Sequence, residues 1–385
     1  MQRLGIVSDC IHFKNADGKI GTENHILLQQ LQALATHFSS VVICCPFVAF
    51  DDKKVASFYT DERISFISVP NVGGNSITDK LKMLFVIPKW LAAFKKVDAL
   101  SDVVYQRFPN NLNLPGFFYF HLKRKKVFAT FTGTWDDYAA EPKSYLFQKK
   151  LLRKYFRGPV WAYLDKPSTN PKIHAGFSPS YSNIVWDEET EQVNKRLQKL
   201  KNSKLETLKL ITVGAFVANK NQQLILDACL LLRQQHIPFT LTLVGDGILK
   251  DAYQIFIDEY QLNNQIFIAG KKTSTELREL YRQNDFVVQA PIYEGFGKVP
   301  IEGFFHGLIP VLSNVELAKV MVANGERGYV FEQNNVESLV NILVDIYQNQ
   351  SELINQIILG RGYAKSQTLE AWANDYAATV ASFYK

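Results

Sequence analysis

Residues 266–297 read IFIAGKKTSTELRELYRQNDFVVQAPIYEGFG. An apolar, β-branched run opens this stretch, a second one follows at 285–291, and a helical pattern lies between them at 273–283. The helical pattern starts with Thr273 and Glu276, which have the spacing of a capping box at a helix N-terminus. A strand, a helix and a second strand in this order predict two parallel strands joined by a crossover helix.

The same alternation continues on both sides of this stretch. The second half has further strand-like runs at 208–216, 239–247 and 309–314, and a helical pattern at 221–235. The first half repeats the theme less regularly, with strand candidates at 3–9, 40–47, 64–70, 102–109 and 126–132, and an amphipathic helix at 24–38. Such alternation indicates α/β structure with parallel sheets covered on both faces. A chain of 385 residues exceeds one compact core, so we expect two such domains.

The stretch YEGFGKVPIEGFFHG (293–307) places Glu294 and Glu302 eight positions apart, after the strand at 285–291. We expect the next helix to begin near Val299, because Pro300 suits a first helical turn. Free amides at a helix N-terminus attract phosphates. An anion over these amides and two carboxylates that accept hydrogen bonds from hydroxyl groups would together fit a nucleotide sugar. Taken alone, the stretch equally allows a helix-stabilising acid and a simple loop charge.

The sequence EGFGKVPIE looks like the motif of retaining glycosyltransferases in family 4, the glycosyl transferases of group 1, which have the GT-B fold. Further segments follow that family's order: 211–228, 241–247, 266–297, 307–314 and 325–343. The resemblance is close over 208–365 and thinner over 1–200. It implies two Rossmann-like domains that face each other across a cleft.

The resemblance also implies which residues bind the donor. Glu294 would contact the donor sugar, Glu302 the ribose, and Lys220 the diphosphate. A fixed cation stabilises the charge of a departing nucleoside diphosphate, so Glu294 and Lys220 are the expected catalytic residues. The other expected donor-binding residues are Gly21, in a glycine-rich loop with Glu23, and Gly245, Gly270, Lys271, Gly295, Phe296, Gly297, Lys298 and Val299.

Two positions depart from the family pattern. The arginine that usually accompanies the lysine corresponds to Ala215, and Arg107 is a candidate substitute. The family's acceptor-side histidine is not evident, and TFTGTWDDY (130–138) occupies its place. The acceptor-site candidates are therefore Thr134, Asp136, Asp137 and Arg107.

The expected domains follow from the resemblance and from an almost wholly polar segment at 187–206. We expect an acceptor-binding Rossmann-like domain at 1–182, a linker at 183–206 and a nucleotide-sugar-binding Rossmann-like domain at 207–365. A final helix at 366–385 would cross back to the first domain. The chain contains no Asp-x-Asp triplet, so we expect neither a metal nor any other cofactor.

Charge is unevenly distributed along the chain. The net charge is +6, but residues 79–157 carry sixteen Lys or Arg against six Asp or Glu. Basic residues interleaved with aromatic ones suit an anionic membrane surface, whereas solvated helix faces explain them equally well. No nucleic-acid-binding motif accompanies the charge, so nucleic acid is not an expected partner. The expected acceptor is a glycan or a lipid-linked sugar.

The expected location is cytoplasmic, with peripheral association at the inner face of the membrane. The N-terminus shows no signal-peptide pattern, and the four cysteines form no CxxC pair. Two other classes of function remain open at this point. A nucleotide-sugar epimerase of the same architecture would use the donor cleft without an acceptor, and a binding protein would retain the fold without catalysis.

Overall fold

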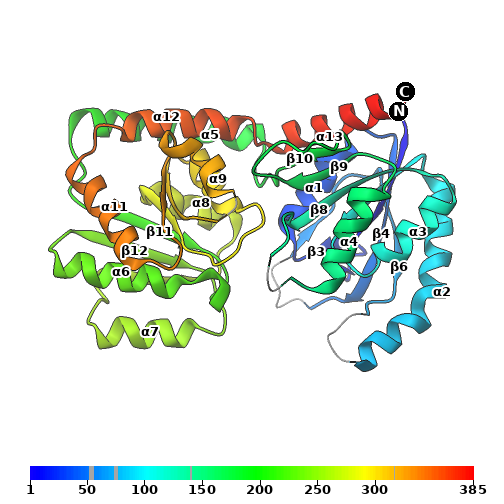
Figure 1. Ribbon diagram of the computed structural model, residues 1–385, viewed down its shortest axis with the longest axis horizontal. Helices are drawn as coiled ribbons and strands as arrows, with labels where there is room; N and C mark the ends of the chain where they lie inside the picture. Colours follow the sequence, from blue (N-terminus) through cyan, green and yellow to red (C-terminus); the bar gives the residue numbers. More distant parts are fainter. Residues whose placement is uncertain (52–55, 73–76, 139–140, 316) are drawn as a thin grey trace. The chain divides into compact units, whose positions relative to one another are not determined.

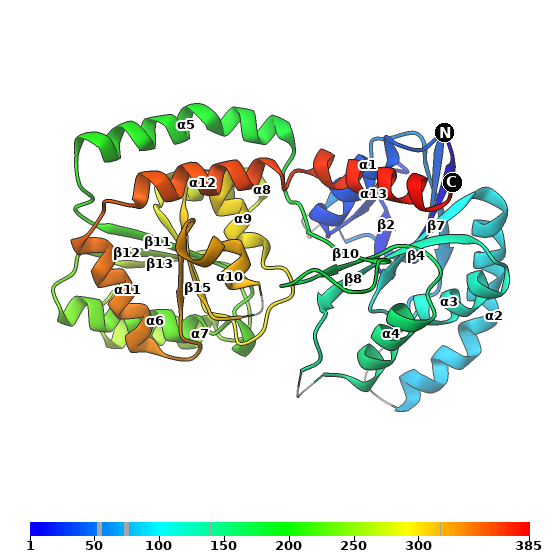
Figure 2. The same ribbon diagram turned by 45° about the horizontal axis from the view of Figure 1, so that its top comes forward.

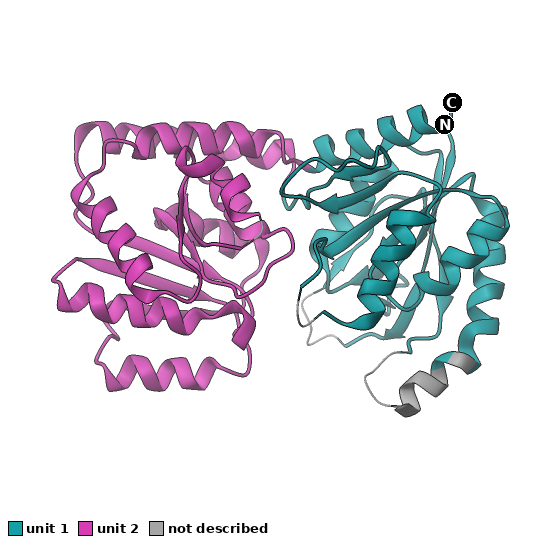
Figure 3. Ribbon diagram, viewed as in Figure 1, with its two compact units in different colours: residues 1–180, 369–385 teal, residues 181–368 magenta. Residues whose placement is uncertain are grey.

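The structure of the protein is a computed structural model, which describes residues 1–51, 56–72, 77–138, 141–315 and 317–385. Two compact units make up the chain (Figure 3). The N-terminal unit consists of residues 1–180 and 369–385, and the C-terminal unit consists of residues 181–368. Among the described residues, no helix is both long and apolar enough to cross a bilayer.

A mixed sheet with a parallel centre forms the middle of the N-terminal unit (Figure 1). Its parallel strands follow the order β6-β4-β1-β7-β8-β9-β10, and β2 extends the far end of β4. The antiparallel pairs β2–β3 and β3–β5 complete the sheet. The strands are β1 (Arg3–Val7), β2 (His12–Lys14), β3 (Ile20–Thr22), β4 (Ser40–Ala49), β5 (Ser57–Phe58), β6 (Ile64–Val69), β7 (Val103–Phe108), β8 (Lys126–Thr134), β9 (Val160–Tyr163) and β10 (Ile173–Ala175).

Helices cover both faces of this sheet, and each face has its own apolar core. Helices α2 (Ile77–Leu100), α3 (Asn113–Leu122) and α4 (Lys143–Lys154) pack on one face. Helices α1 (His25–Ala35) and α13 (Leu369–Phe383) pack on the other, where the Trp161 and Tyr376 rings stack 3.9 Å apart. The last helix of the chain therefore belongs to the same unit as the first strand (Figure 2).

The C-terminal unit has an entirely parallel sheet in the order β13-β12-β11-β14-β15-β16. Helices α6, α7 and α11 contribute to the core on one face, and α8 and α9 to the core on the other. The strands are β11 (Leu208–Val213), β12 (Phe239–Val244), β13 (Ile266–Gly270), β14 (Phe286–Gln289), β15 (Ile309–Ser313) and β16 (Tyr329–Phe331). The helices are α5 (Asn183–Asn202), η1 (Ala218–Lys220), α6 (Gln222–Gln234), α7 (Lys250–Glu259), α8 (Ser274–Gln283), α9 (Lys298–Phe305), α10 (Ala318–Met321), η2 (Ala323–Gly325), α11 (Val336–Gln348) and α12 (Leu353–Lys365).

Both units are Rossmann-like, because in each sheet the third, second, first and fourth parallel strands along the chain are neighbours in that order. The predicted α/β class is thus confirmed. The stretch 266–297 forms β13, α8 and β14, and the predicted capping box between Thr273 and Glu276 is present.

Residues 183–202 form helix α5 inside the C-terminal unit, instead of the polar linker that the sequence predicts for 183–206. A fully buried carboxylate anchors the helix. Glu189 accepts hydrogen bonds from Arg278 at 2.5 Å and from Arg282 at 2.6 Å, and the Nδ1 atom of His306 lies 3.1 Å away. The segment is mostly polar, which hides the apolar residues Val193, Leu197 and Leu200 that pack on the core at helical spacing, and its buried anchor is a charge.

Substitution of Glu189 tests how α5 is held. Burial alone would raise the pKa of Glu189, but His306, Arg282 and Arg278 outweigh it and hold the pKa below its ordinary value of 4.5. The carboxylate therefore contributes stability above about pH 4.5, and this contribution is lost as the pH falls further. Glu189→Gln should lower the free energy of unfolding at pH 7 by about 3 kcal/mol, measured by urea denaturation.

The neighbouring Glu188 provides a matched control. Its exposed carboxylate pairs with Arg278 at 2.7 Å, so Glu188→Gln should cost less than about 1 kcal/mol. Equal losses for the two variants, or the same loss for Glu189→Gln at pH 3 as at pH 7, would contradict this role for Glu189.

Candidate functional site

Polar residues gather at the carboxyl ends of the central strands of the C-terminal sheet. Strand order reverses between β11 and β14, and in doubly wound sheets ligands bind at such a point, beyond the carboxyl ends of the strands. The chain after β11 forms the short helix η1, and the chain after β14 forms the loop at 290–297 that leads into α9. These two segments carry Lys220 and Glu294.

Lys220 and Glu294 form an ion pair between the Nζ and Oε2 atoms. The two side chains are 26% and 27% exposed, so solvent and a ligand can reach the pair. The sequence predicts both residues at one site, although they are 74 positions apart. The fold brings them together because the carboxyl ends of adjacent parallel strands meet at one edge of a sheet.

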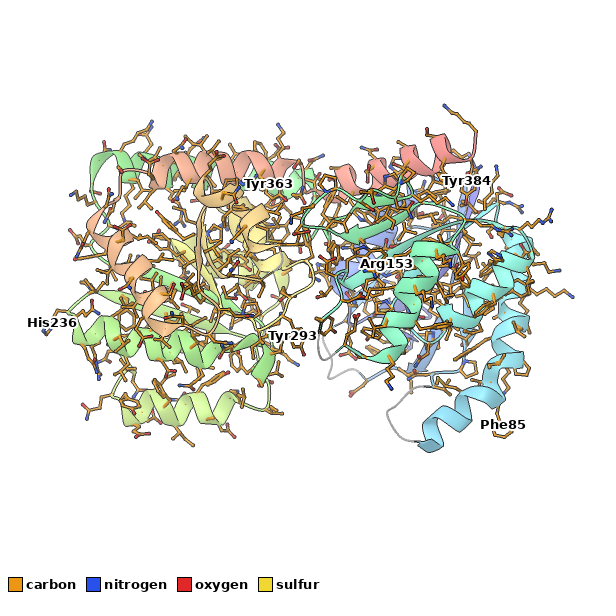
Figure 4. All side chains as sticks on the ribbon, in the orientation of Figure 1. Phe85, Arg153, His236, Tyr293, Tyr363 and Tyr384 are labelled. Atoms are coloured by element: carbon orange, nitrogen blue, oxygen red, sulfur yellow. The ribbon has the colours of Figure 1, made fainter. Side chains whose placement is uncertain are left out.

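Asn219 fixes the spacing between these two segments, and the sequence analysis did not identify it. Its side chain donates to the Tyr293 carbonyl at 3.1 Å and accepts from the Tyr293 amide at 3.2 Å. Its own carbonyl accepts from the Ile292 amide at 2.9 Å. Tyr293 itself projects from this loop (Figure 4). Asn219 therefore holds the backbone next to Lys220 against the backbone next to Glu294.

Helix α9 begins at Lys298, one residue before the predicted start, and Pro300 lies in its first turn. The residue before the helix, Gly297, has a φ of 69°, in the left-handed region that favours glycine. As a glycine, this N-cap residue has no side chain and makes no capping hydrogen bond. The amides of Lys298 and Val299 therefore lie at a helix start that suits an anion.

Glu302 lies in α9, where its side chain is buried and accepts a hydrogen bond from the Tyr281 hydroxyl at 2.8 Å. The Tyr281 ring stacks on His306, which in turn lies beside Glu189. A continuous buried network thus fixes the position of Glu302. The sequence gives no sign of this network, because an aromatic residue at a helical core position does not reveal that its hydroxyl has a partner.

The predicted glycines of the C-terminal unit lie at the same edge of the sheet. A Cβ atom on Gly245 would stand 1.9 Å from the Gly214 carbonyl oxygen, so close approach of two loops demands a glycine there. Gly270 ends β13 with a φ of 71° and open space around it, and the exposed Lys271 follows. The partly buried Gly295 and the buried Phe296 lie in the loop that carries Glu294.

Gly21 belongs to the other unit and lies in strand β3 instead of the predicted loop. A Cβ atom there would stand 2.5 Å from the Ser57 carbonyl oxygen and 2.8 Å from the Phe58 ring. Strand packing alone therefore accounts for this glycine, and the donor-binding role stays a prediction. Glu23 follows β3, just before helix α1.

The acceptor-site candidates also lie in the N-terminal unit, and their environments differ. Thr134 is buried at the end of β8, and Asp136 is exposed beside it. Asp137 is already engaged, since its carboxylate lies 3.1 Å from both Lys149 and Arg153. Burial opposes ionisation, yet the two cations hold the pKa of Asp137 below its ordinary value. Arg107 lies near the end of β7.

No group of three or more His, Cys, Asp or Glu side chains is arranged to hold a metal ion within the described parts of the chain. The four cysteines are free thiols, and Cys44, Cys45 and Cys229 are buried.

Comparison with known proteins gives the fold and a family match for part of the chain. The fold matches that of the Anabaena protein HepE, crystallised in complex with UDP, with a TM-score of 0.69, 15% identity and coverage of 99% of this chain and 100% of that one. The fold is therefore GT-B, which two Rossmann-like units define. Residues 194–359 match the family glycosyl transferases group 1.

Curated relatives match part of the chain. An uncharacterized glycosyltransferase of Methanocaldococcus jannaschii is 29% identical over 138 residues, which are 36% of this chain and 38% of the relative. The amylovoran biosynthesis glycosyltransferase AmsK of Erwinia amylovora is 19% identical over 175 residues, 44% of this chain and 43% of the relative. The matched part thus spans about two fifths of these relatives.

Proposed function

We propose that the protein is a retaining, metal-independent glycosyltransferase that moves a sugar from a nucleotide-sugar donor to an acceptor. One observation carries the proposal: Lys220 and Glu294 are paired at the strand-order reversal of the C-terminal sheet. A sugar nucleotide has its hydroxyl groups and its diphosphate side by side. A carboxylate and a cation held together match that junction.

The donor would bind along the carboxyl edge of the C-terminal sheet. Glu294 would accept hydrogen bonds from sugar hydroxyls, while Lys220 and the amides of residues 296–299 would receive the diphosphate. When the bond between the sugar and the phosphate oxygen breaks, negative charge collects on the departing diphosphate, and a fixed cation stabilises it most at that moment. Glu302 would bind the ribose, and Gly245, Gly270 and Lys271 would line the base.

Donor binding requires the ion pair to open. The Lys220 ammonium would exchange the Glu294 carboxylate for phosphate oxygens, and Glu294 would exchange the ammonium for hydroxyl groups. The ammonium then pairs with phosphate and the carboxylate accepts from hydroxyl groups. Opening the ion pair therefore leaves neither half-buried charge without a hydrogen-bond partner. The pairing with Glu294 also holds Lys220 in position before the donor arrives, which reduces the cost of ordering a long side chain.

The proposed acceptor is a glycan or a lipid-linked sugar, bound by the N-terminal unit. The candidates Thr134, Asp136 and Arg107 would line that site, whereas Asp137 would support it through Lys149. A role in polysaccharide biosynthesis is supported by the name of the relative AmsK. Cytoplasmic location is part of the same proposal.

The charge-neutral variants Lys220→Gln and Glu294→Gln test the catalytic assignment. Each should reduce sugar transfer by about a hundredfold or more while leaving the thermal transition of the protein in place. Glu259→Gln, which removes an exposed carboxylate at the end of α7, is the control and should keep the wild-type rate. The rate is measured with the donor and acceptor that support transfer, with and without EDTA.

Three outcomes would count against the assignment. Full activity of Glu294→Gln would show that the pair is structural. A loss of activity in EDTA would contradict metal independence, and a product of inverted anomeric configuration, read by NMR, would contradict retention.

A peripheral membrane contact is a further part of the proposal, and it concerns the block of residues 79–157. The side chains of 77–82 and 84 lie outside the described ones. On α2, α3 and α4, and at the residue after α4, large apolar side chains are exposed next to the basic residues: Phe85 (Figure 4), Phe118, Leu122, Phe147 and Tyr155. Apolar side chains within a strongly cationic surface suit an anionic bilayer.

Vesicle co-sedimentation tests this contact. The protein should bind vesicles that contain phosphatidylglycerol and not those of phosphatidylcholine alone, because the proposed attraction is electrostatic. Leu122→Gln should weaken binding, since Leu122 is 81% exposed at the end of α3. Ile255→Gln removes an exposed apolar residue from the C-terminal unit and should have no effect. Equal binding to both kinds of vesicle, or no effect of Leu122→Gln, would contradict the contact.

A further inference from the structure

Arg107 occupies a special position in the N-terminal sheet. It is the penultimate residue of β7, and β7 pairs with β1 on one side and β8 on the other. Strand order in this sheet reverses between β1 and β7, as it does between β11 and β14 in the other unit. Arg107 therefore lies where a doubly wound sheet binds a ligand.

The guanidinium group of Arg107 is half-buried and poorly satisfied. Its hydrogen bond to a side chain is a long one, from Nη1 to the Tyr105 hydroxyl at 3.4 Å. Within the described part of the chain, no Asp or Glu oxygen lies within 4.0 Å of it. Arginine carries five N–H donors, so most of the hydrogen-bonding capacity of this group is unused by those residues.

Three other partly buried arginines of the protein pair with carboxylates. Arg196 pairs with Asp285 at 2.5 Å, Arg278 with Glu189 at 2.5 Å, and Arg282 with Glu189 at 2.6 Å. A cation that leaves water without an anionic partner is costly, and the cost falls when an anion binds. Arg107 thus differs from these three, and also from Arg361 and Arg327, which lack a carboxylate but donate to backbone carbonyls.

The surroundings of Arg107 supply hydroxyl groups but little negative charge. The Tyr105 hydroxyl bonds to Thr130 at 2.8 Å, and Thr130 bonds to the Tyr376 hydroxyl at 2.9 Å. Asp9 follows β1 on the same edge; burial raises its pKa, although Arg107 and Asn110 act in the opposite direction. The protein therefore leaves the Arg107 charge largely uncompensated.

A buried cluster of amide side chains fixes the backbone of Arg107. Asn110 and Asn113 both donate to the Arg107 carbonyl, and Asn113 also donates to the Val7 carbonyl at 3.0 Å. The backbone N–H of Asn110 donates to the Gln148 side-chain oxygen at 2.9 Å. The three amide residues are at most 6% exposed. This cluster ties β1, β7 and α4 together, so the arginine projects from a rigid base.

We propose that Arg107 forms an anion-binding site in the N-terminal unit and that the ligand group is a phosphate. The planar guanidinium fork matches two phosphate oxygens, which would replace the single long contact with Tyr105. The inference rests on the proposed glycosyltransferase function, in which this unit binds the acceptor. The phosphate would then belong to the acceptor, or else to the donor diphosphate, where Ala215 leaves one basic contact missing.

Inorganic phosphate is the probe for this site, titrated against the thermal transition of the full chain at constant ionic strength. Arg107→Gln should weaken phosphate binding by about tenfold or more, because charge-assisted hydrogen bonds contribute about 1.5–3 kcal/mol. Arg107→Lys should weaken it less, since the charge remains while the fork is lost. Lys123→Gln removes one exposed positive charge from the same unit and should bind phosphate as the wild type does.

Repeating the titration with saturating UDP or GDP distinguishes the two sources of the phosphate, the acceptor and the donor. Phosphate binding that persists in the nucleotide-saturated protein and in Lys220→Gln, but not in Arg107→Gln, assigns the site to the acceptor. A loss of nucleotide affinity in Arg107→Gln as large as that in Lys220→Gln assigns it to the donor.

Wild-type phosphate affinity in a folded Arg107→Gln protein would overturn the proposal. If the protein is not a glycosyltransferase, the titrations give a result different from that one. The wild-type protein would then bind neither nucleotide, while Arg107 would still determine its affinity for phosphate.

Discussion

The ion pair between Lys220 and Glu294 joins two segments at the point where the C-terminal sheet reverses its strand order. Its position follows from topology, because β11 and β14 are neighbours and their carboxyl ends open on the same edge. Asn219 then sets the spacing with three hydrogen bonds. Every donor-side role proposed for this protein depends on that spacing, since the cation and the carboxylate must meet adjacent parts of one ligand.

The two halves of the proposed donor site are held in different ways. Glu294 is partly exposed and paired with a lysine that can exchange partners. Glu302 is buried and held by Tyr281, which packs on His306 next to the anchor of helix α5. An ion pair that can exchange partners suits the place where the bond between the sugar and the phosphate breaks. A buried carboxylate held by other side chains suits a position that only orients the ligand.

Much of this arrangement could be predicted from the sequence. Strands β13 and β14, the capped helix α8 and the start of α9 follow from local signals: β-branched runs, Thr273 with Glu276, and Pro300 after a glycine-rich loop. Helix α5 was not predicted as part of the C-terminal unit, because its apolar residues Val193, Leu197 and Leu200 stand in a mostly polar segment and its anchor is a buried charge whose partners lie about 90 positions away. The role of Asn219 was hidden for the same reason. Its partners are close only because two parallel strands are neighbours.

Thermal stability against a panel of UDP-, GDP-, ADP-, dTDP- and CMP-sugars, without added metal, tests the central claim most directly. A donor at a hundred times its dissociation constant stabilises the folded protein by about 2.7 kcal/mol. One nucleotide class should therefore raise the transition temperature of the wild-type protein, and Lys220→Gln should remove most of that shift. If no sugar nucleotide changes the transition, with or without magnesium, the ion pair has no donor to bind and the glycosyltransferase proposal is contradicted.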